Sequence, residues 1–457
     1  MSLSVNTTKS YLFKLSIPIF FSNIAIPFAG LVDVGLMGHL DNVKFLAATS
    51  IATSAITMIF WSFGFLRMGT VGLVAQSLGR KDYSEIFLIL VRNLILAFLI
   101  GIAIIFCKDL ILLSIKTFFL ISEETFLLIE NYISIRILSA PAELVIYVLA
   151  GFYLGLQKTN ISSLMISFFC IGNALLSTIL VINYDLEILG VAIGTTASAY
   201  LTVIIFLLLS FFSLRNKIKS TLNYRKIFNL IKLIKLFNIN FDIFIRTILL
   251  TFSFLWVTYQ GSKLGENYLA VNAILMQFIM LASFFLDAYA FSTEAIIGYT
   301  IGKRAKNSFL SAVTNSFQLS IFSGLVISVI FFLSFRIIIN ELTNIDYIKF
   351  LAFNYIFWII AIPPVASICY QFDGIFIGAS QTAEMRNAMI LSVLLFIISS
   401  LFLVTNFGNH GVWLSLLFFM LNIIPAKSTS GPSSFCNLSK SSWLCTLLLK
   451  VSATPNM

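Results

Sequence analysis

Residues 86–107 read IFLILVRNLILAFLIGIAIIFC, and this apolar run holds a single charged side chain, Arg92. A helix of about 20 mostly apolar residues is long enough to cross the hydrocarbon core of a bilayer. Similar stretches recur on both sides of this run, and five prolines inside them predict kinked or broken helices: Pro18, Pro27, Pro141, Pro363 and Pro364. The sequence therefore predicts an all-α integral membrane protein with twelve transmembrane helices, at residues 12–37, 46–72, 86–107, 129–156, 161–183, 188–213, 237–260, 267–298, 308–335, 348–378, 388–406 and 411–424.

The composition of the whole chain agrees with a membrane location. Of its 457 residues, 59% are hydrophobic and 11% are charged, whereas about 25% of the residues of a soluble globular protein are charged. The net charge of +10 lies mostly in short loops between apolar runs, which argues against a nucleic-acid partner. Five cysteines without a C-x-x-C pair and only two histidines indicate neither a metal site nor a cofactor. Since no nucleophile motif stands out either, we do not expect an enzyme.

The loops predict the orientation of the chain. Basic residues gather near the N-terminus, at Arg80 and Lys81, within 215–235 and at Lys303 and Arg304, and they are sparse in the loops between. Such alternation marks the basic loops as cytoplasmic. The first apolar run is too long for a signal peptide and lacks a small-residue cleavage site, so it should remain as the first helix. We expect a plasma-membrane protein, in a bacterium an inner-membrane protein, with a cytoplasmic N-terminus.

The chain also matches itself when it is shifted by 223 residues. The shift pairs small residues and helix breakers in two separate regions: Gly38 with Gly261, Gly79 with Gly302, Tyr132 with Tyr355, Pro141 with Pro364, Gly151 with Gly374, and Gly155 with Gly378. Each repeat would hold six helices, an even number, so both enter the membrane from the same side as parallel repeats. Two such halves are typical of a transporter, and the alternative is a duplicated structural scaffold.

The repeats set the predicted domain boundaries. An N-terminal six-helix lobe spans 1–214, a basic cytoplasmic linker 215–236, a C-terminal six-helix lobe 237–424 and an atypical polar tail 425–457. The spacing of Ile and Leu in the linker predicts a helix on the cytoplasmic surface of the membrane. The twelfth predicted helix is short for a full span. It indicates either a truncated or altered C-terminus, or a short helix that a thinner bilayer or the tail completes.

Ionisable residues within the predicted spans are the candidates for function, because each costs about 2.5–3.5 kcal/mol at mid-bilayer on insertion scales. They are Asp33, Arg67, Arg92, Arg136, Glu143, Asp242, Arg246, Asp287, Glu294 and Asp373. Arg92, Asp242 and Arg246 lie near predicted helix ends, where we expect them to reach the membrane interface. Arg136 and Glu143 are seven residues apart, so they share a helix face. Either the two residues form a structural ion pair, or Arg136 pairs with a carboxylate on another helix.

Asp33 is the strongest of these candidates. It lies between Gly30 and Gly35 in the outer half of the first span, where small residues leave room for water or a close helix. A carboxylate whose surroundings change as a transporter opens can couple transport to protons. The alternative is a carboxylate at a helix end that faces the water outside.

Three stretches together resemble the multidrug and toxic compound extrusion (MATE) family. They are LVDVGLMGHL at 31–40, LAA at 46–48 and RMGTVGLVAQSLG at 67–79. The run DGIFIG at 373–378 is similar to the DinF-type branch of that family. The resemblance implies two six-helix lobes and an antiporter without a cofactor. Such an antiporter exports organic, often cationic, compounds against inflowing protons or sodium ions.

The resemblance also implies roles for single residues. Asp33 stands in the place of the coupling carboxylate on the first helix, Asn173 in the same cluster, and Pro18 where that helix bends. Ser177 stands where relatives often carry a second carboxylate, which leaves sodium open as the coupling ion, although we favour protons. The other intramembrane charges that we expect to line a cavity or a gate are Arg67, Glu143, Asp287, Glu294 and Asp373.

The sequence thus predicts a secondary active exporter of organic, cationic or amphipathic compounds, driven by a proton gradient. Its partners would be small organic solutes and the lipid bilayer, and the chain would act as a monomer. One alternative is a flippase of lipid-linked precursors, which should have a more strongly cationic central cavity than this sequence offers. Another is a defective copy that transports nothing, for which the unusual C-terminus is the only support.

Overall fold

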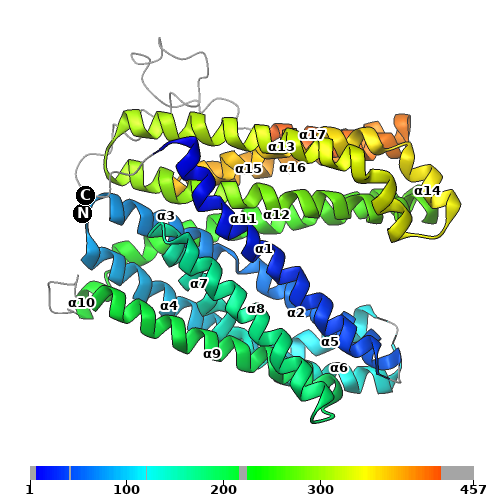
Figure 1. The fold of residues 1–457 in the computed structure, drawn as a ribbon, viewed down its shortest axis with the longest axis horizontal. Helices are drawn as coiled ribbons and strands as arrows, with labels where there is room; N and C mark the ends of the chain where they lie inside the picture. Colours follow the sequence, from blue (N-terminus) through cyan, green and yellow to red (C-terminus); the bar gives the residue numbers. More distant parts are fainter. Residues whose placement is uncertain (1–6, 41–42, 120, 216–223, 424–457) are drawn as a thin grey trace. The chain divides into compact units, whose positions relative to one another are not determined.

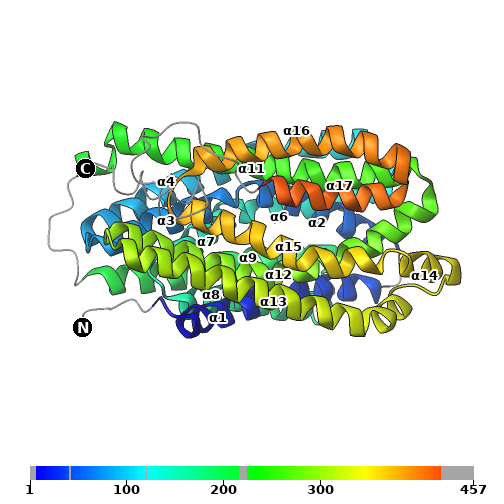
Figure 2. The same ribbon diagram turned by 90° about the horizontal axis from the view of Figure 1, so that it is seen from above.

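The structure is a computed structural model, and it describes residues 7–40, 43–119, 121–215 and 224–423. Every regular element in these ranges is helical, and most helices are long (Figures 1 and 2). In chain order they are α1 (Lys9–Gly38), α2 (Val43–Ser62), α3 (Phe65–Gly79), α4 (Tyr83–Phe106), α5 (Lys108–Phe118), α6 (Glu123–Arg136), the 3₁₀ turn η1 (Ile137–Ser139), α7 (Ala140–Gly155), α8 (Thr159–Ile182), α9 (Glu187–Arg215), α10 (Tyr224–Ile227), α11 (Leu230–Lys263), α12 (Glu266–Gly302), α13 (Lys306–Leu342), α14 (Asp346–Phe353), α15 (Ile356–Gly378), α16 (Thr382–Phe407) and α17 (Asn409–Asn422).

Among the described residues, 11 helical stretches are long and apolar enough to cross a membrane. Two of them are composite, since α2 with α3 forms one stretch and α6, η1 and α7 form another. The last predicted span corresponds to α17, which has 14 residues and is shorter than the other spans. The predicted polar tail, 425–457, lies outside the described residues.

The chain divides into two compact units. The N-terminal unit comprises residues 17–240, and the C-terminal unit comprises residues 1–16 together with 241–457. In the N-terminal unit, α8 packs along α9, and α7 packs against α3 and α4. In the C-terminal unit, α15 packs between α12 and α13, and α16 packs along α17 (Figures 1 and 2).

Glycines bring α3 and α7 together in the N-terminal unit. A methyl group on Gly151 would clash with the backbone carbonyl of Arg67, and one on Gly155 would press on Val71 and Val74. Small residues at such positions let two helix backbones approach closely. This glycine pair therefore packs two helices of the same chain against each other.

The C-terminal unit repeats this packing at the residues that the shift of 223 predicts. A methyl group on Gly374 would clash with the carbonyl oxygen of Ala290, and one on Gly378 would meet the carbonyl oxygen of Glu294 and the side chain of Ile297. These residues are the shifted counterparts of those between α3 and α7. The internal repeat is thus one of helix contacts as well as of sequence.

The prolines differ in whether they interrupt a helix. In the N-terminal unit, η1 interrupts the span just before Pro141, as predicted. By contrast, α1 is continuous across Pro18 and Pro27, and α15 of the C-terminal unit is continuous across Pro364. Proline has no N–H, so the carbonyl of Ile360, four residues before Pro364, lacks its helical donor. The Ser328 hydroxyl on α13 donates to that carbonyl at 2.7 Å, which replaces the lost hydrogen bond.

A buried polar contact fixes the short helix α17. Trp413 is fully buried, and its Nε1 donates to Oδ1 of Asn272 on α12 at 3.0 Å. The side chains of Asn272 and Asn409 exchange two hydrogen bonds, of 2.7 and 3.0 Å. The backbone of Gly411 lies directly against that of Leu403 on α16. The short helix is therefore packed into the apolar core of its unit.

Part of the predicted linker is helical and packs on the N-terminal unit. Residues 216–223 lie outside the described part of the chain, α10 follows, and α11 begins at Leu230. Ile227 is buried, whereas Leu230, Ile231 and Ile234 are more than half exposed. The predicted helical periodicity is thus present from residue 230 onward.

Candidate functional site

Asp33 of α1 is a buried carboxylate with one hydrogen bond from another helix. Asp33 is only 8% exposed. Nδ2 of Asn173 on α8 donates to Oδ2 of Asp33 at 3.3 Å. Its other oxygen, Oδ1, is buried and accepts no hydrogen bond from the residues that the structure describes. A buried charged oxygen without a partner is energetically costly, so Asp33 is a place where a proton or a small cation would lower the energy.

Asn173 is itself held by two hydroxyls, which fix the orientation of its amide. Its Oδ1 accepts from the hydroxyls of Ser177 and Thr195, both at 2.9 Å. The amide oxygen is thereby engaged, and the NH₂ group is turned toward Asp33. Gly194 allows α9 to lie this close to α8, because a methyl group at Gly194 would clash with the backbone of Ser177.

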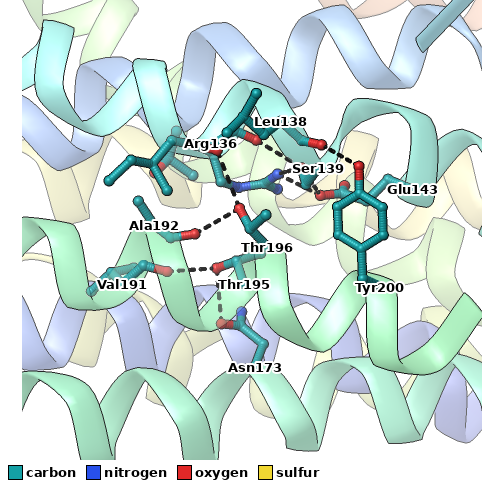
Figure 3. A network of polar contacts seen from close by, with 12 residues as sticks. Arg136, Leu138, Ser139, Glu143, Asn173, Val191, Ala192, Thr195, Thr196 and Tyr200 are labelled. Atoms are coloured by element: carbon teal, nitrogen blue, oxygen red, sulfur yellow. Dashed lines mark hydrogen bonds and ion pairs between the residues drawn. The ribbon is translucent and has the colours of Figure 1, made fainter. Parts of the chain in front are cut away.

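A second polar cluster lies at the break between α6 and α7 (Figure 3). Arg136 forms an ion pair with Glu143, and Nη1 of Arg136 also donates to the hydroxyl of Ser139. That hydroxyl contacts Glu143 Oε1 at 2.8 Å. The side chains of Arg136 and Glu143 are each 12% exposed. The sequence left open whether these two residues pair, and in the structure they do.

The remaining predicted charges lie on helices α3, α12 and α15. Arg67 is on α3 of the N-terminal unit, and Asp287 and Glu294 are on α12 of the C-terminal unit, where Glu294 is almost fully buried. Asp373 of α15 forms a buried ion pair with Arg246 of α11. Pro18 lies inside α1. Within the N-terminal unit, the structure therefore brings Asp33, Asn173 and Ser177 together in one cluster.

Arg92, Asp242 and Arg246, which we expect near the membrane interface, are all buried in the protein. Asp242 binds the guanidinium of Arg386 and accepts from the hydroxyl of Thr382 at 2.9 Å. The helix α11 begins several residues before the predicted span, so positions near the predicted end lie well inside the helix. Asp242 and Arg246 are each paired with a residue distant in sequence, whereas Arg92 is paired with Glu85 of its own helix.

Sequence reasoning missed one member of the Asp33 cluster, Thr195. It lies in the run Gly194-Thr195-Thr196 of α9, and a polar pair next to glycine inside an apolar run is the signal that marks it. Its hydroxyl also donates to the carbonyl of Val191 at 3.0 Å. Thr195 therefore shares its hydroxyl proton between its own helix and Asn173.

The repeat does not reproduce this cluster in the C-terminal unit. The shift of 223 places Trp256 at the position of Asp33 and Ser400 at that of Ser177. Nε1 of Trp256 donates to Oγ of Ser400 at 2.8 Å. The two positions thus remain in contact across two helices, but a neutral indole has taken the place of the carboxylate.

Comparison with known proteins connects these features to a family. The family described as MatE matches residues 18–180 and again 242–403, once in each repeat. DNA damage-inducible protein F of Escherichia coli (strain K12) is 34% identical over 411 residues, which cover 90% of this chain and 89% of that protein. Multidrug export protein MepA of Staphylococcus aureus (strain MSSA476) is 22% identical over 420 residues, covering 90% and 91%.

Solved structures share the fold. The MATE transporter VcmN of Vibrio cholerae superposes with a TM-score of 0.80 at 16% identity, covering 97% of this chain and 96% of that one. A transporter of the MOP superfamily from Pyrococcus furiosus gives a TM-score of 0.80 at 17% identity, covering 91% and 93%. At such identities the likeness concerns the arrangement of the helices.

Proposed function

This chain belongs to the MatE family of multidrug and toxic compound exporters, and from that premise we propose that it is a proton-driven antiporter in which Asp33 carries the coupling proton. Its substrates would be cationic or amphipathic organic compounds. It would act as a monomer without a cofactor in the bacterial inner membrane, with the N-terminus in the cytoplasm.

The observation that carries the proposal is the buried, half-satisfied carboxylate of Asp33. One oxygen accepts from Asn173, and the other has no hydrogen-bond partner within the described part of the chain. A proton on that free oxygen removes the charge and leaves the hydrogen bond from Asn173 in place. Asp33 can thus change its protonation state without rearrangement of Asn173, which Ser177 and Thr195 hold in position.

Proton coupling supplies enough energy for export. Moving one elementary charge through about 100 mV releases about 2.3 kcal/mol. A tenfold gradient of a neutral solute requires about 1.4 kcal/mol. One proton therefore sustains a gradient of roughly fortyfold before any difference in pH is added.

Aromatic content and similarity support organic cations as substrates. Phe, Trp and Tyr make up 15% of the chain, and aromatic rings attract organic cations through cation–π contacts. The relative in Staphylococcus aureus is named a multidrug export protein. These two points favour a shape-tolerant site for apolar cations over a site for one polar metabolite.

Dye transport in everted membrane vesicles tests the proposal. With an imposed proton gradient and no sodium, we expect wild-type protein to transport cationic dyes and Asp33→Asn to lose at least nine tenths of that transport. Asp109→Asn is the matched control, since Asp109 is a highly exposed carboxylate in the same unit, and it should transport at the wild-type rate.

Three outcomes would contradict the proposal. If transport requires sodium, the sodium ion and not the proton is the coupling ion. Equal transport by Asp33→Asn and wild type would remove Asp33 from the coupling site. An absence of dye transport under either ion would favour the flippase or the defective copy, which an assay of lipid-linked precursor translocation then separates.

A further inference from the structure

An aromatic stripe runs along one face of α11 in the C-terminal unit. Phe252, Trp256, Tyr259 and then Lys263 follow one another at intervals of three or four residues, so they share one side of the helix. Phe252 is 38% exposed, Tyr259 is 47% exposed, and Trp256 is partly buried. The aromatic stripe, defined as Phe252, Trp256 and Tyr259, therefore presents ring surface that the helices of its own unit do not cover.

The three rings of the stripe lie against one another. The ring centroids of Phe252 and Trp256 are 6.0 Å apart, and those of Trp256 and Tyr259 are 5.3 Å apart. Aromatic rings at such distances are in direct contact. The stripe is thus one contiguous patch with the indole at its centre.

A buried serine fixes this indole. Nε1 of Trp256 donates to Oγ of Ser400 on α16 at 2.8 Å, and Ser400 is 1% exposed. The hydroxyl of Ser400 in turn donates to the carbonyl of Ile397 on its own helix at 2.8 Å. The polar end of the indole is therefore engaged inside the unit, and the orientation of the ring is set before a ligand arrives. Such preorganisation lowers the cost of binding.

A cation already lies on the stripe. Nζ of Lys263 is 4.5 Å from the centroid of the Tyr259 ring, and a ring attracts a cation within about 6 Å. The side chain of Lys263 is exposed and flexible, yet its charge lies over the ring. The end of the stripe thus accepts a positive charge.

The internal repeat places this stripe on the helix face that carries Asp33 in the first repeat. The shift of 223 aligns Trp256 with Asp33. It also aligns Phe396 with Asn173, and the ring of Phe396 lies 5.2 Å from that of Phe419. Positions that are polar in the N-terminal unit are therefore aromatic in the C-terminal unit, and aromatic rings suit organic cations.

We propose that the aromatic stripe is a binding site for organic cations, and that Lys263 competes with them for the ring of Tyr259. The inference rests on the proposed function, because it names the place where the C-terminal unit holds the substrates of that function. Trp256 is the main contact, since indole binds cations most strongly among the aromatic side chains. The apolar parts of an organic cation pack on the same rings, so the site takes ring-bearing cations of varied shape.

Equilibrium binding to detergent-purified protein tests the inference with two probes of similar shape. Tetraphenylphosphonium is a cation, and tetraphenylborate is an anion of nearly the same size. We expect Trp256→Leu and Tyr259→Leu to bind the phosphonium about three- to tenfold more weakly than wild type, with a much smaller change for the borate. Trp256→Phe keeps a ring at the centre of the stripe and should retain more affinity than Trp256→Leu.

Lys263→Gln should increase the affinity. The change vacates the ring of Tyr259 and removes a like charge, so the variant should bind the phosphonium about twofold more tightly or better. Since Lys263 is exposed, this variant also serves if Trp256→Leu fails to fold. Two controls should bind as wild type does: Lys349→Gln removes another cation of the same unit, and Phe254→Leu removes a ring from the opposite side of α11.

Unchanged phosphonium affinity in Trp256→Leu, or no gain in Lys263→Gln, would overturn the inference, and the stripe would then be a surface for lipid acyl chains. Equal losses for phosphonium and borate would overturn it as well, because an apolar patch does not distinguish the sign of a charge. The binding measurement needs no ion gradient. If phosphonium binding shifts as expected but Asp33→Asn transports normally, the inference stands and the proposed coupling role of Asp33 fails.

Discussion

The ion pair between Arg246 and Asp373 shows how single residues hold this protein together. Both side chains are about one tenth exposed, and they come from α11 and α15. A buried ion pair contributes little compared with an apolar pair of the same size, but the loss of one partner leaves an unpaired buried charge. The removal of one partner should therefore be far more harmful than the removal of both.

We expect Arg246→Met to destabilise the purified protein by about 3–5 kcal/mol. The double variant Arg246→Met with Asp373→Asn should recover most of that loss. Thermal unfolding in detergent measures both, with Lys44→Met as the control, because Lys44 belongs to an exposed pair. Equal melting temperatures for the single variant and wild type would mean that Asp373 finds another partner.

At this scale the sequence predicted the candidates better than their contacts. Asp33 stood out because it is charged within an apolar run and flanked by glycines, and Asn173 and Ser177 followed from the resemblance. Their contact in the structure agrees with that grouping, while their role in coupling stays a prediction. Arg246 could not be matched to Asp373, because 127 residues separate them and their contact depends on the register of two helices.

At the scale of helices, glycine positions determine which helices pack closely. Gly151 and Gly374 each lie against a carbonyl of the neighbouring helix, α3 or α12. A side chain at either position would force the two backbones apart, and overpacking of this kind costs about 1–3 kcal/mol. The glycines therefore fix the distance between two spans in each unit.

Gly151→Val should lower the melting temperature of the detergent-purified protein by several degrees and reduce the monodisperse fraction in size-exclusion chromatography. Gly30→Ala is the matched control, because a methyl group at Gly30 meets nothing within 4 Å. It should be neutral or slightly stabilising, since alanine favours helix more than glycine does. A neutral Gly151→Val would show that α3 and α7 can separate without loss of stability.

The sequence predicted these helices and their repeat well, but it did not distinguish the proline that interrupts a helix from those that do not. Long apolar runs and aligned glycines are local signals, and they led to the all-helical membrane fold, which is confirmed. Proline alone did not determine breaks. The span is interrupted at Pro141 but is continuous at Pro364, where Ser328 replaces the lost hydrogen bond from another helix. Such compensation depends on the tertiary structure.

At the scale of the whole chain, the segment between the repeats is attached to the N-terminal unit. Nε of Arg92 on α4 donates to the carbonyl of Ile227 at 2.9 Å, and its Nη2 donates to that of Lys226 at 2.6 Å. Glu85 completes the contact, since it binds Arg92 at 3.0 Å and Lys232 at 2.5 Å. One buried guanidinium thus fastens α10 to α4.

Arg92→Met should release this segment while leaving the spans intact. We expect trypsin to cleave near Lys226 and Lys232 at least several times faster than in wild type, because the backbone there loses its two donors. Arg80→Met, a change at the loop between α3 and α4, is the control for the loss of one basic residue. Unchanged cleavage rates in Arg92→Met would show that apolar contacts of Ile227 alone hold the segment.

The two repeats share their helix packing but differ in the side chains of their polar sites. The glycine contacts recur at the shifted positions, but Trp256 stands where Asp33 stands in the first repeat. Helix packing follows from backbone geometry, which the repeat preserves, whereas a site depends on a few side chains that can change singly. The sequence shift therefore predicts where helices touch, but the match does not imply that both repeats carry the same site.

The pairing of Arg246 with Asp373 has a consequence for how the protein is made. The chain is synthesised from its N-terminus, so Arg246 leaves the ribosome while Asp373 has yet to be translated. During that interval the membrane receives a helix whose cation has no partner, and α11 can reach its final position only after α15 arrives. Arg136 and Glu143, seven residues apart, leave the ribosome almost together and can enter the bilayer already neutralised.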